Sequence, residues 1–218
     1  MDILERRYTA DPVELRGDPG HQKIGGYAAV FNKLSRNLGG FVEQVAPAAF
    51  NDSRGRDWPD VRARYNHEIL LGTTAARTLT LSIDATGLLY EVEPPQSRAD
   101  IVELVTRGDV RHSSFAFRTI EDHWDTSDQG YPMRTLLKVQ LVDVAPVDDP
   151  AYPDATAGLR SLAQRFDAEF EEVRQMAQED ELRKFFETTG TTRTKAKPKT
   201  LGAAARMAIL GREQDPTQ

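Results

Sequence analysis

Short runs of strand-forming residues, separated by turn residues, succeed one another up to about residue 154, and beyond that point the apolar pattern becomes helical. The predicted strands begin at Val13, Lys23, Gly39, Val61, Thr78, Leu88, Val110 and Met133. The segments 84–87 and 127–130 carry the turn residues that antiparallel hairpins use. About eight closely spaced strands favour a bent sheet closed into a barrel or half-open, because closure removes exposed strand edges. The expected class is α+β, mainly antiparallel β.

Two helices are expected between these strands. Pro47–Phe50 can open a short one, because proline is tolerated in the first turn of a helix. Ser97–Asp100 has the spacing of a capping box, and an apolar stripe then continues to Gly108, a residue that commonly ends helices.

The chain beyond Ala155 is predicted to be helical. Apolar residues recur there at spacings of three and four, which predicts one amphipathic helix over residues 156–188 that packs on the barrel or on a partner. Residues 189–218 are predicted to form a flexible linker and a short terminal helix. The expected organisation is therefore a β domain over residues 1–155, followed by these two segments.

Composition excludes several kinds of chemistry. The chain has 218 residues and no cysteine, so disulfides, thiolate zinc sites and cysteine nucleophiles are excluded. A formal net charge of −6 argues against general nucleic-acid binding. No apolar run approaches the roughly 20 residues that span a bilayer, and the N-terminus does not read as a signal peptide, so a soluble protein is expected.

Strand alternation places two polar residues among apolar ones. His67 is in phase with the apolar residues of the run that begins at Val61, and so lies at the end of an apolar face. Asp143 is in phase with Leu137, Val139 and Leu141. A buried carboxylate needs a partner, because desolvating an unpaired charge costs several kcal/mol.

The run from Val110 contains the serine pair Ser113-Ser114. Alternation places Ser114 on the face opposite Phe115 and Phe117, and Ser113 on the same face as these two rings. If the rings fill the interior, Ser114 faces outward and Ser113 needs a hydrogen bond to the backbone. One β-bulge would reverse such assignments.

A serine, a histidine and a carboxylate are the components of nucleophilic acyl transfer. Alternative interpretations remain open at this point. His67 could form a hydrogen bond to the backbone, and Ser114 could be a small residue that leaves room for a closely packed neighbour. Asp143 could pair with Arg62 or Arg118. A metal site built from His67, His112, His123 and Asp122 or Asp125 has no signature spacing behind it.

Several segments together resemble the prohead (procapsid maturation) proteases of tailed bacteriophages. The similar segments are GGYAAVFN (25–32), GFVEQVAPAAF (40–50), ARYNHE (63–68), TLTLSIDATGLLYEVEPP (78–95), VTRGDVRHSSFAF (105–117) and LVDVAPVDDPAYPDA (141–155). Their order and spacing match from residue 20 to residue 155, and the chain from Ala157 onward lies outside the resemblance.

The resemblance implies roles for individual residues. His67, in Asn66-His67-Glu68, matches the family's catalytic base, and Ser114, directly before the first Phe of S-F-x-F, matches its nucleophile. Asp143 stands where family members usually carry a glutamate and is expected to complete the triad, with Glu68 as the lesser candidate. Backbone amides would form the oxyanion hole, and no metal or cofactor is implied.

The resemblance also implies a fold and a function. The family is similar in fold to herpesvirus assembly proteases, a bent antiparallel barrel ringed by helices. Its members cleave scaffold protein or the scaffold-like N-terminal segment of the major capsid protein, and often themselves, inside the procapsid in the host bacterial cytoplasm. Self-association of the protease is a further expectation. The alternative is a catalytically silent, protease-like scaffold protein, whereas a cellular serine hydrolase is disfavoured because the chain has no G-x-S-x-G motif.

Overall fold

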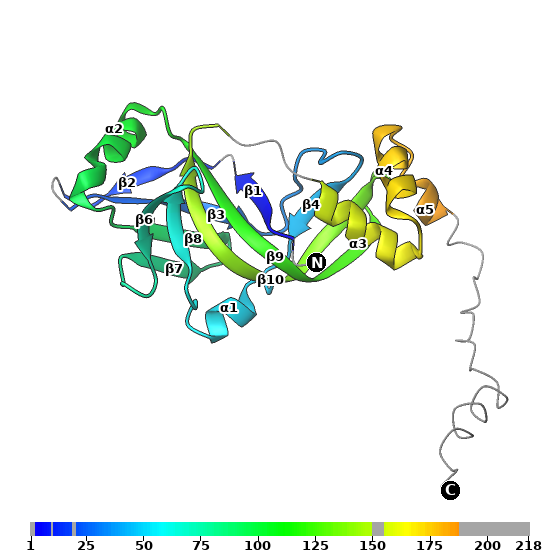
Figure 1. Cartoon of the computed structure of the whole chain (residues 1–218), viewed down its shortest axis with the longest axis horizontal. Coiled ribbons are helices and arrows are strands. Elements are labelled where there is room, and N and C mark those ends of the chain that lie inside the picture. Colours follow the sequence, from blue (N-terminus) through cyan, green and yellow to red (C-terminus); the bar gives the residue numbers. More distant parts are fainter. Residues whose placement is uncertain (1–2, 10, 19–20, 150–154, 188–218) are drawn as a thin grey trace, which may run out of the picture. The chain divides into compact units, whose positions relative to one another are not determined.

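The strands of the protein form two sheets, seen in a computed structural model that describes residues 3–9, 11–18, 21–149 and 155–187 (Figure 1). The strands are β1 (Glu5–Thr9), β2 (Glu14–Arg16), β3 (Lys23–Val30), β4 (Val42–Val45), β5 (Arg62–Tyr65), β6 (Ile69–Thr73), β7 (Leu79–Ile83), β8 (Gly87–Val92), β9 (His112–Thr126) and β10 (Pro132–Val147). The helices are α1 (Asn51–Gly55), the 3₁₀ turn η1 (Gln96–Arg98), α2 (Ala99–Arg107), α3 (Thr156–Phe166), α4 (Phe170–Gln178) and α5 (Lys184–Glu187).

The larger sheet has the order β1-β9-β10-β5-β6, with β4 also paired to β10, and the smaller sheet has the order β2-β3-β8-β7. Most pairs are antiparallel, while β10 pairs in parallel with β4 and β5. The predicted α+β class is confirmed, but the expectation of a closed barrel is wrong for the described residues. The two sheets cover each other's apolar faces, so burial is achieved without closing the edges.

The core between the sheets is built from their facing side chains. Phe115 and Phe117 of β9 stack with ring centroids 4.8 Å apart and are almost fully buried. They belong to the same cluster as Leu88 and Tyr90 of β8 in the other sheet. The rings therefore fill the interior, which is the condition on which the outward position of Ser114 depends.

The long hairpin of β9 and β10 runs through the larger sheet (Figure 1). The predicted turn at 127–130 closes it, with Gly130 at φ 73° and its N–H donating to the carbonyl of Ser127 at 2.7 Å. Register shifts interrupt the pairing of β9 and β10 at three places, one of them between Leu141 and Asp143. The sequence analysis missed two strands, β1 and β6.

The helices differ from prediction at their ends. The helix expected near Ser97 begins with η1 and continues as α2, and no side chain caps its N-terminus, so the predicted capping box does not form. Its end at Gly108, which has φ 80°, is confirmed. A short helix after Pro47 is present as α1.

The single helix predicted over residues 156–188 is wrong. Asp167 at φ 52° and Asp180 at φ 58° adopt the left-handed conformation, which ends a helix, so the segment folds as α3, α4 and α5. These helices pack on the β domain: a Cβ on Gly158 of α3 would lie 2.6 Å from the ring of Phe41. The predicted linker and terminal helix lie outside the described residues. Within those residues, no helix has the length and apolarity to cross a membrane.

An ion network lies beneath β1 in the larger sheet. The guanidinium of Arg134 on β10 donates to Glu5 on β1 at 2.7 Å, to Glu43 on β4 at 2.9 Å and to Asp122 on β9 at 2.6 Å. The guanidinium of Arg7 donates to the same two glutamates. Burial by itself raises the pKa of Glu5, but the two arginines outweigh burial and hold that pKa below its ordinary value. The ion pairs therefore link four strands of the sheet, β1, β4, β9 and β10, and the two arginines share the carboxylates of Glu5 and Glu43 as partners.

We expect Arg134→Met to destabilise the fold by roughly 3–5 kcal/mol, because it removes the cation that Asp122 binds and one of the two cations that Glu5 and Glu43 share. For a chain of this size the melting temperature should fall by roughly 10 °C. Lys138→Met is the control, because the Lys138–Asp52 ion pair is exposed and such a pair is worth about 1 kcal/mol at most. Thermal unfolding followed by circular dichroism measures both variants, and equal shifts would contradict the expectation.

Candidate active site

Ser114, His67 and Asp143 come together on the larger sheet. The imidazole Nε2 of His67 lies 2.7 Å from Ser114 Oγ, and its Nδ1 lies 2.6 Å from Asp143 Oδ1. The side chains of His67 and Asp143 are 5% and 8% exposed. The three residues predicted from the sequence as a catalytic set are thus in one hydrogen-bonded chain.

The position of Ser114 follows from its strand. Ser114 lies opposite Tyr8 on one neighbouring strand and Ala145 on the other, so β1 and β10 flank it. Its side chain faces away from the Phe115 and Phe117 rings, as alternation predicted. Ser114 is 4% exposed and lines a cavity rather than projecting into open solvent.

Ser113 points to the opposite side of the sheet, as predicted, and is fully buried. Its Oγ lies 3.2 Å from the hydroxyl of Tyr90 on β8, so its partner is a side chain and the predicted backbone partner is wrong. Burial raises the pKa of Tyr90, which keeps the phenol neutral. The two adjacent hydroxyls therefore lie in different surroundings, and Ser114 is the one beside the imidazole.

His67 is not in a strand, contrary to the sequence prediction. Strand β5 ends at Tyr65, and Asn66 and His67 form the tight turn to β6 with φ values of 52° and 62°. Positive φ at both central residues is a property of type I′ hairpin turns and costs roughly 1 kcal/mol or more per non-glycine residue. The Asn66 N–H donates to the carbonyl of Pro146, and the Asn66 side chain accepts from the N–H of Asp148. These bonds tie the turn to β10.

Asp143 reaches His67 because of a β-bulge. Val144 lies opposite Phe115 and Leu141 lies opposite Phe117, so both face the core, whereas Asp143 lies opposite Ala116. The register shift between Leu141 and Asp143 turns the carboxylate to the face of Ser114. The predicted phase of Asp143 with Leu141 is therefore wrong, for the reason that bulges invert alternation.

The alternative pairing of Asp143 with Arg62 does not form. Arg62 donates to both carboxylate oxygens of Asp60, not to Asp143. Within the described residues, no three histidine, aspartate or glutamate side chains are grouped as metal ligands. Glu68, the lesser candidate for the third position, lies on the wall of the cavity beside His67.

A cavity of about 250 Å³ opens beside Ser114. Its wall consists of Arg6, Arg7, Tyr8, Asn66, His67, Glu68, Ser114, Val147, Asp148 and Asp149. Burial alone raises the pKa of Asp148, but hydrogen bonds from the Tyr65 hydroxyl and from neighbouring groups lower it more, so the carboxyl stays ionised. The cavity wall around the Ser114 hydroxyl is therefore polar and carries charges of both signs.

Strand β1 is the part of the site that sequence reasoning missed. It supplies Arg6, Arg7 and Tyr8 to the cavity wall, and the carbonyl of Arg7 accepts a hydrogen bond from Ser114 Oγ at 2.9 Å. The sequence ERRYT places charged residues at buried positions, so it has no apolar alternation to mark a strand. Strand propensity at Tyr8 and Thr9 was the available signal, and it was weak.

A model of the caudovirus prohead serine protease family matches residues 10–169, more than two thirds of the chain. The chain belongs to this family. The resemblance inferred from the motifs is thus confirmed, and the protein is placed among the serine proteases of phage head maturation. The match includes all three candidate residues and continues through α3, so the prediction that similarity stops near residue 155 is wrong. Strand β1 precedes the matched range.

No curated protein and no solved structure matches the chain.

Proposed function

We propose that this prohead protease family member is an active serine endopeptidase in which Ser114 is the nucleophile, His67 the general base and acid, and Asp143 the orienting carboxylate. One observation carries the proposal: the imidazole of His67 lies 2.7 Å from Ser114 Oγ and 2.6 Å from Asp143 Oδ1, beside an open cavity. This is the arrangement that nucleophilic acyl transfer requires.

The chemistry follows from which nitrogen of His67 carries the proton. With Asp143 accepting from Nδ1–H, Nε2 is left as an acceptor facing Ser114. As Ser114 Oγ attacks the scissile carbonyl carbon, its proton passes to Nε2, and the resulting imidazolium is stabilised by Asp143. The imidazolium then gives that proton to the leaving amine, which yields an acyl-enzyme. Water, deprotonated by His67, hydrolyses the ester and restores the Ser114 hydroxyl.

Aspartate can fill a position where the family usually carries glutamate because of the local backbone. The aspartate side chain is one methylene shorter, but the bulge at Asp143 and the turn at His67 bring the two groups within 2.6 Å. We infer that the close approach of these two backbone segments compensates for the shorter reach of the aspartate side chain.

The substrates we propose are scaffold protein or the scaffold-like N-terminal segment of the major capsid protein, cleaved within the procapsid in the host cytoplasm. Family membership supports this substrate class. The segment 189–200, which consists largely of Thr and Lys and also contains a Gly and a Pro, is a second candidate substrate, either within the same chain or between copies.

Co-expression with its cognate capsid and scaffold proteins tests the proposal. We expect the wild type to shorten one of these proteins and His67→Ala to leave both intact, because His67 supplies both proton transfers. Intact-mass measurement of the protease in the same samples reports whether 189–200 is cut. Full-length capsid and scaffold proteins in the presence of folded wild type would favour the silent scaffold protein instead, and cleavage by His67→Ala would overturn the mechanism.

A further inference from the structure

The Ser114 hydroxyl has a second partner besides His67. Its Oγ donates to the backbone carbonyl of Arg7 on β1 at 2.9 Å, and this bond is buried. It joins residues 107 positions apart in the chain. The nucleophile therefore lies between a turn on one side and an edge strand on the other.

We propose that Arg7 is a positioning residue for the nucleophile: its carbonyl orients the Ser114 hydroxyl, and its buried guanidinium holds that carbonyl in place. The inference rests on the proposed function, because it assigns a role to a neighbour of the proposed nucleophile. Arg7 precedes the range 10–169 matched by the family model, so the match assigns it no role.

The carbonyl serves both protonation states of His67. A serine hydroxyl has one proton and can donate to one acceptor at a time. With neutral His67 the hydroxyl can donate either to Nε2, from which attack can follow, or to the Arg7 carbonyl at 2.9 Å, and both acceptors lie close to the same Oγ position. With protonated His67, Nε2–H donates to Oγ and the hydroxyl donates to Arg7. The free Ser114 hydroxyl thus keeps one side-chain position in both protonation states of His67, which preserves the attacking geometry.

Sheet pairing alone leaves this carbonyl weakly held. Strand β1 is five residues long, lies at the edge of the larger sheet and pairs there with β9 alone. Edge strands and chain ends are the parts of a fold most prone to fraying. A nucleophile that depends on such a strand needs an additional constraint on it.

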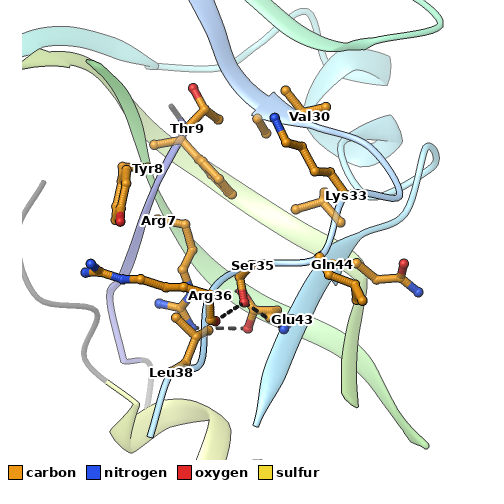
Figure 2. A pocket seen from close by; sticks show the side chains of 14 residues that line it. Arg7, Tyr8, Thr9, Val30, Lys33, Ser35, Arg36, Leu38, Glu43 and Gln44 are labelled. Atoms are coloured by element: carbon orange, nitrogen blue, oxygen red, sulfur yellow. Dashed lines mark hydrogen bonds and ion pairs between the residues drawn. The ribbon is translucent and has the colours of Figure 1, made fainter. Parts of the chain in front are cut away.

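The Arg7 side chain supplies that constraint. Its Nε donates to Glu43 on β4 at 2.8 Å, its Nη2 donates to Glu5 at 2.8 Å, and its Nη1 donates to the carbonyl of Arg6 at 2.8 Å. Figure 2 shows Arg7 of β1 and Glu43 of β4 on the wall of a neighbouring cavity of about 280 Å³. Through Glu43, β1 is tied to a strand with which it makes no backbone ladder.

The cost of burying these charges also points to positioning. Arg7 and Glu43 are both buried. A buried ion pair contributes little more to folding stability than well-packed apolar residues would, because the cost of desolvating the two charges offsets their attraction. A planar guanidinium that bonds three groups, however, fixes distance and direction in a way that apolar contacts do not. The network therefore fixes the position of the β1 backbone that contacts the nucleophile.

Two matched variants test the inference. Glu43→Gln and Asp122→Asn each convert a carboxylate of the same network into its isosteric amide, and both carboxylates accept from Arg134. Glu43 also holds Arg7, whereas Asp122 binds the hydroxyl of Ser161 instead. The readout is the second-order rate constant for labelling of Ser114 by a fluorophosphonate, per folded molecule. We expect Glu43→Gln to label about tenfold more slowly, the effect of losing one orienting hydrogen bond, and Asp122→Asn to stay within about twofold.

Proton NMR separates positioning from a general loss of structure. The proton between His67 Nδ1 and Asp143 should keep its far-downfield resonance in Glu43→Gln, because the change acts on Ser114 alone. Arg7→Lys, which keeps the charge and loses the planar fork, should reproduce the slow labelling and serves as the test if Glu43→Gln does not fold. Equal labelling rates for Glu43→Gln, Arg7→Lys and Asp122→Asn, or loss of that resonance together with labelling, would overturn the inference while leaving the proposed function intact. A folded wild type that is not labelled at Ser114 would overturn both.

Discussion

Replacing Ser114 by alanine is expected to lower kcat for cleavage of a capsid or scaffold substrate by on the order of 10⁵-fold or more, because members of a catalytic unit act together. The fold should be unaffected, since alanine keeps the backbone of β9 and removes one hydroxyl. Timed cleavage of purified substrate followed by gel electrophoresis and mass spectrometry measures the loss.

Ser113→Ala is the matched control for Ser114→Ala. The two residues are adjacent, but Ser113 contacts Tyr90 on the far side of the sheet. Its removal leaves a buried phenol without a partner, so we expect a loss of stability of about 1–3 kcal/mol with kcat changed by a few-fold at most. If Ser113→Ala abolished cleavage in folded protein and Ser114→Ala did not, the assignment of the nucleophile would be reversed.

Replacing Asp143 by asparagine is expected to lower kcat by about 10⁴-fold, as loss of an orienting carboxylate does in serine proteases of known mechanism. An amide can donate to Nδ1 of His67, which moves the imidazole proton to Nε2 and removes the acceptor that Ser114 needs. Stability should change much less than activity, because the substitution conserves volume. Steady-state kinetics with a cleavable peptide, alongside thermal unfolding, separates the two effects.

Glu68→Gln distinguishes the two acids that the sequence offered for the third position. Glu68 is exposed on the cavity wall, whereas the carboxylate that meets Nδ1 at 2.6 Å is that of Asp143. We expect kcat of Glu68→Gln to stay within a few-fold of the wild type. A large loss in Glu68→Gln combined with near-normal Asp143→Asn would assign the orienting role to Glu68.

Local sequence patterns predicted much of this fold. Alternation and turn residues identified eight of the ten strands in the described residues, and Gly108 marked a helix end. Strand β6 was missed because Asn66-His67 does not read as a hairpin turn without the usual glycine. Strand β1 was missed because its inward-facing residues, Glu5 and Arg7, are charged. Both strands depend on tertiary partners that a local pattern does not contain.

The sequence by itself determined the residue types of the site, the face on which each of the two serines lies, and the family, because these depend on strand alternation and on short motifs. Only the tertiary structure decided how the parts meet. A bulge turns Asp143 away from the core, a left-handed turn carries His67 over the sheet, and a charged edge strand holds the carbonyl of Arg7 against Ser114. The physical reason is that a hydrogen bond between residues 47, 76 or 107 positions apart requires a definite register of strands, and one bulge or one turn changes that register without altering the local pattern of residues.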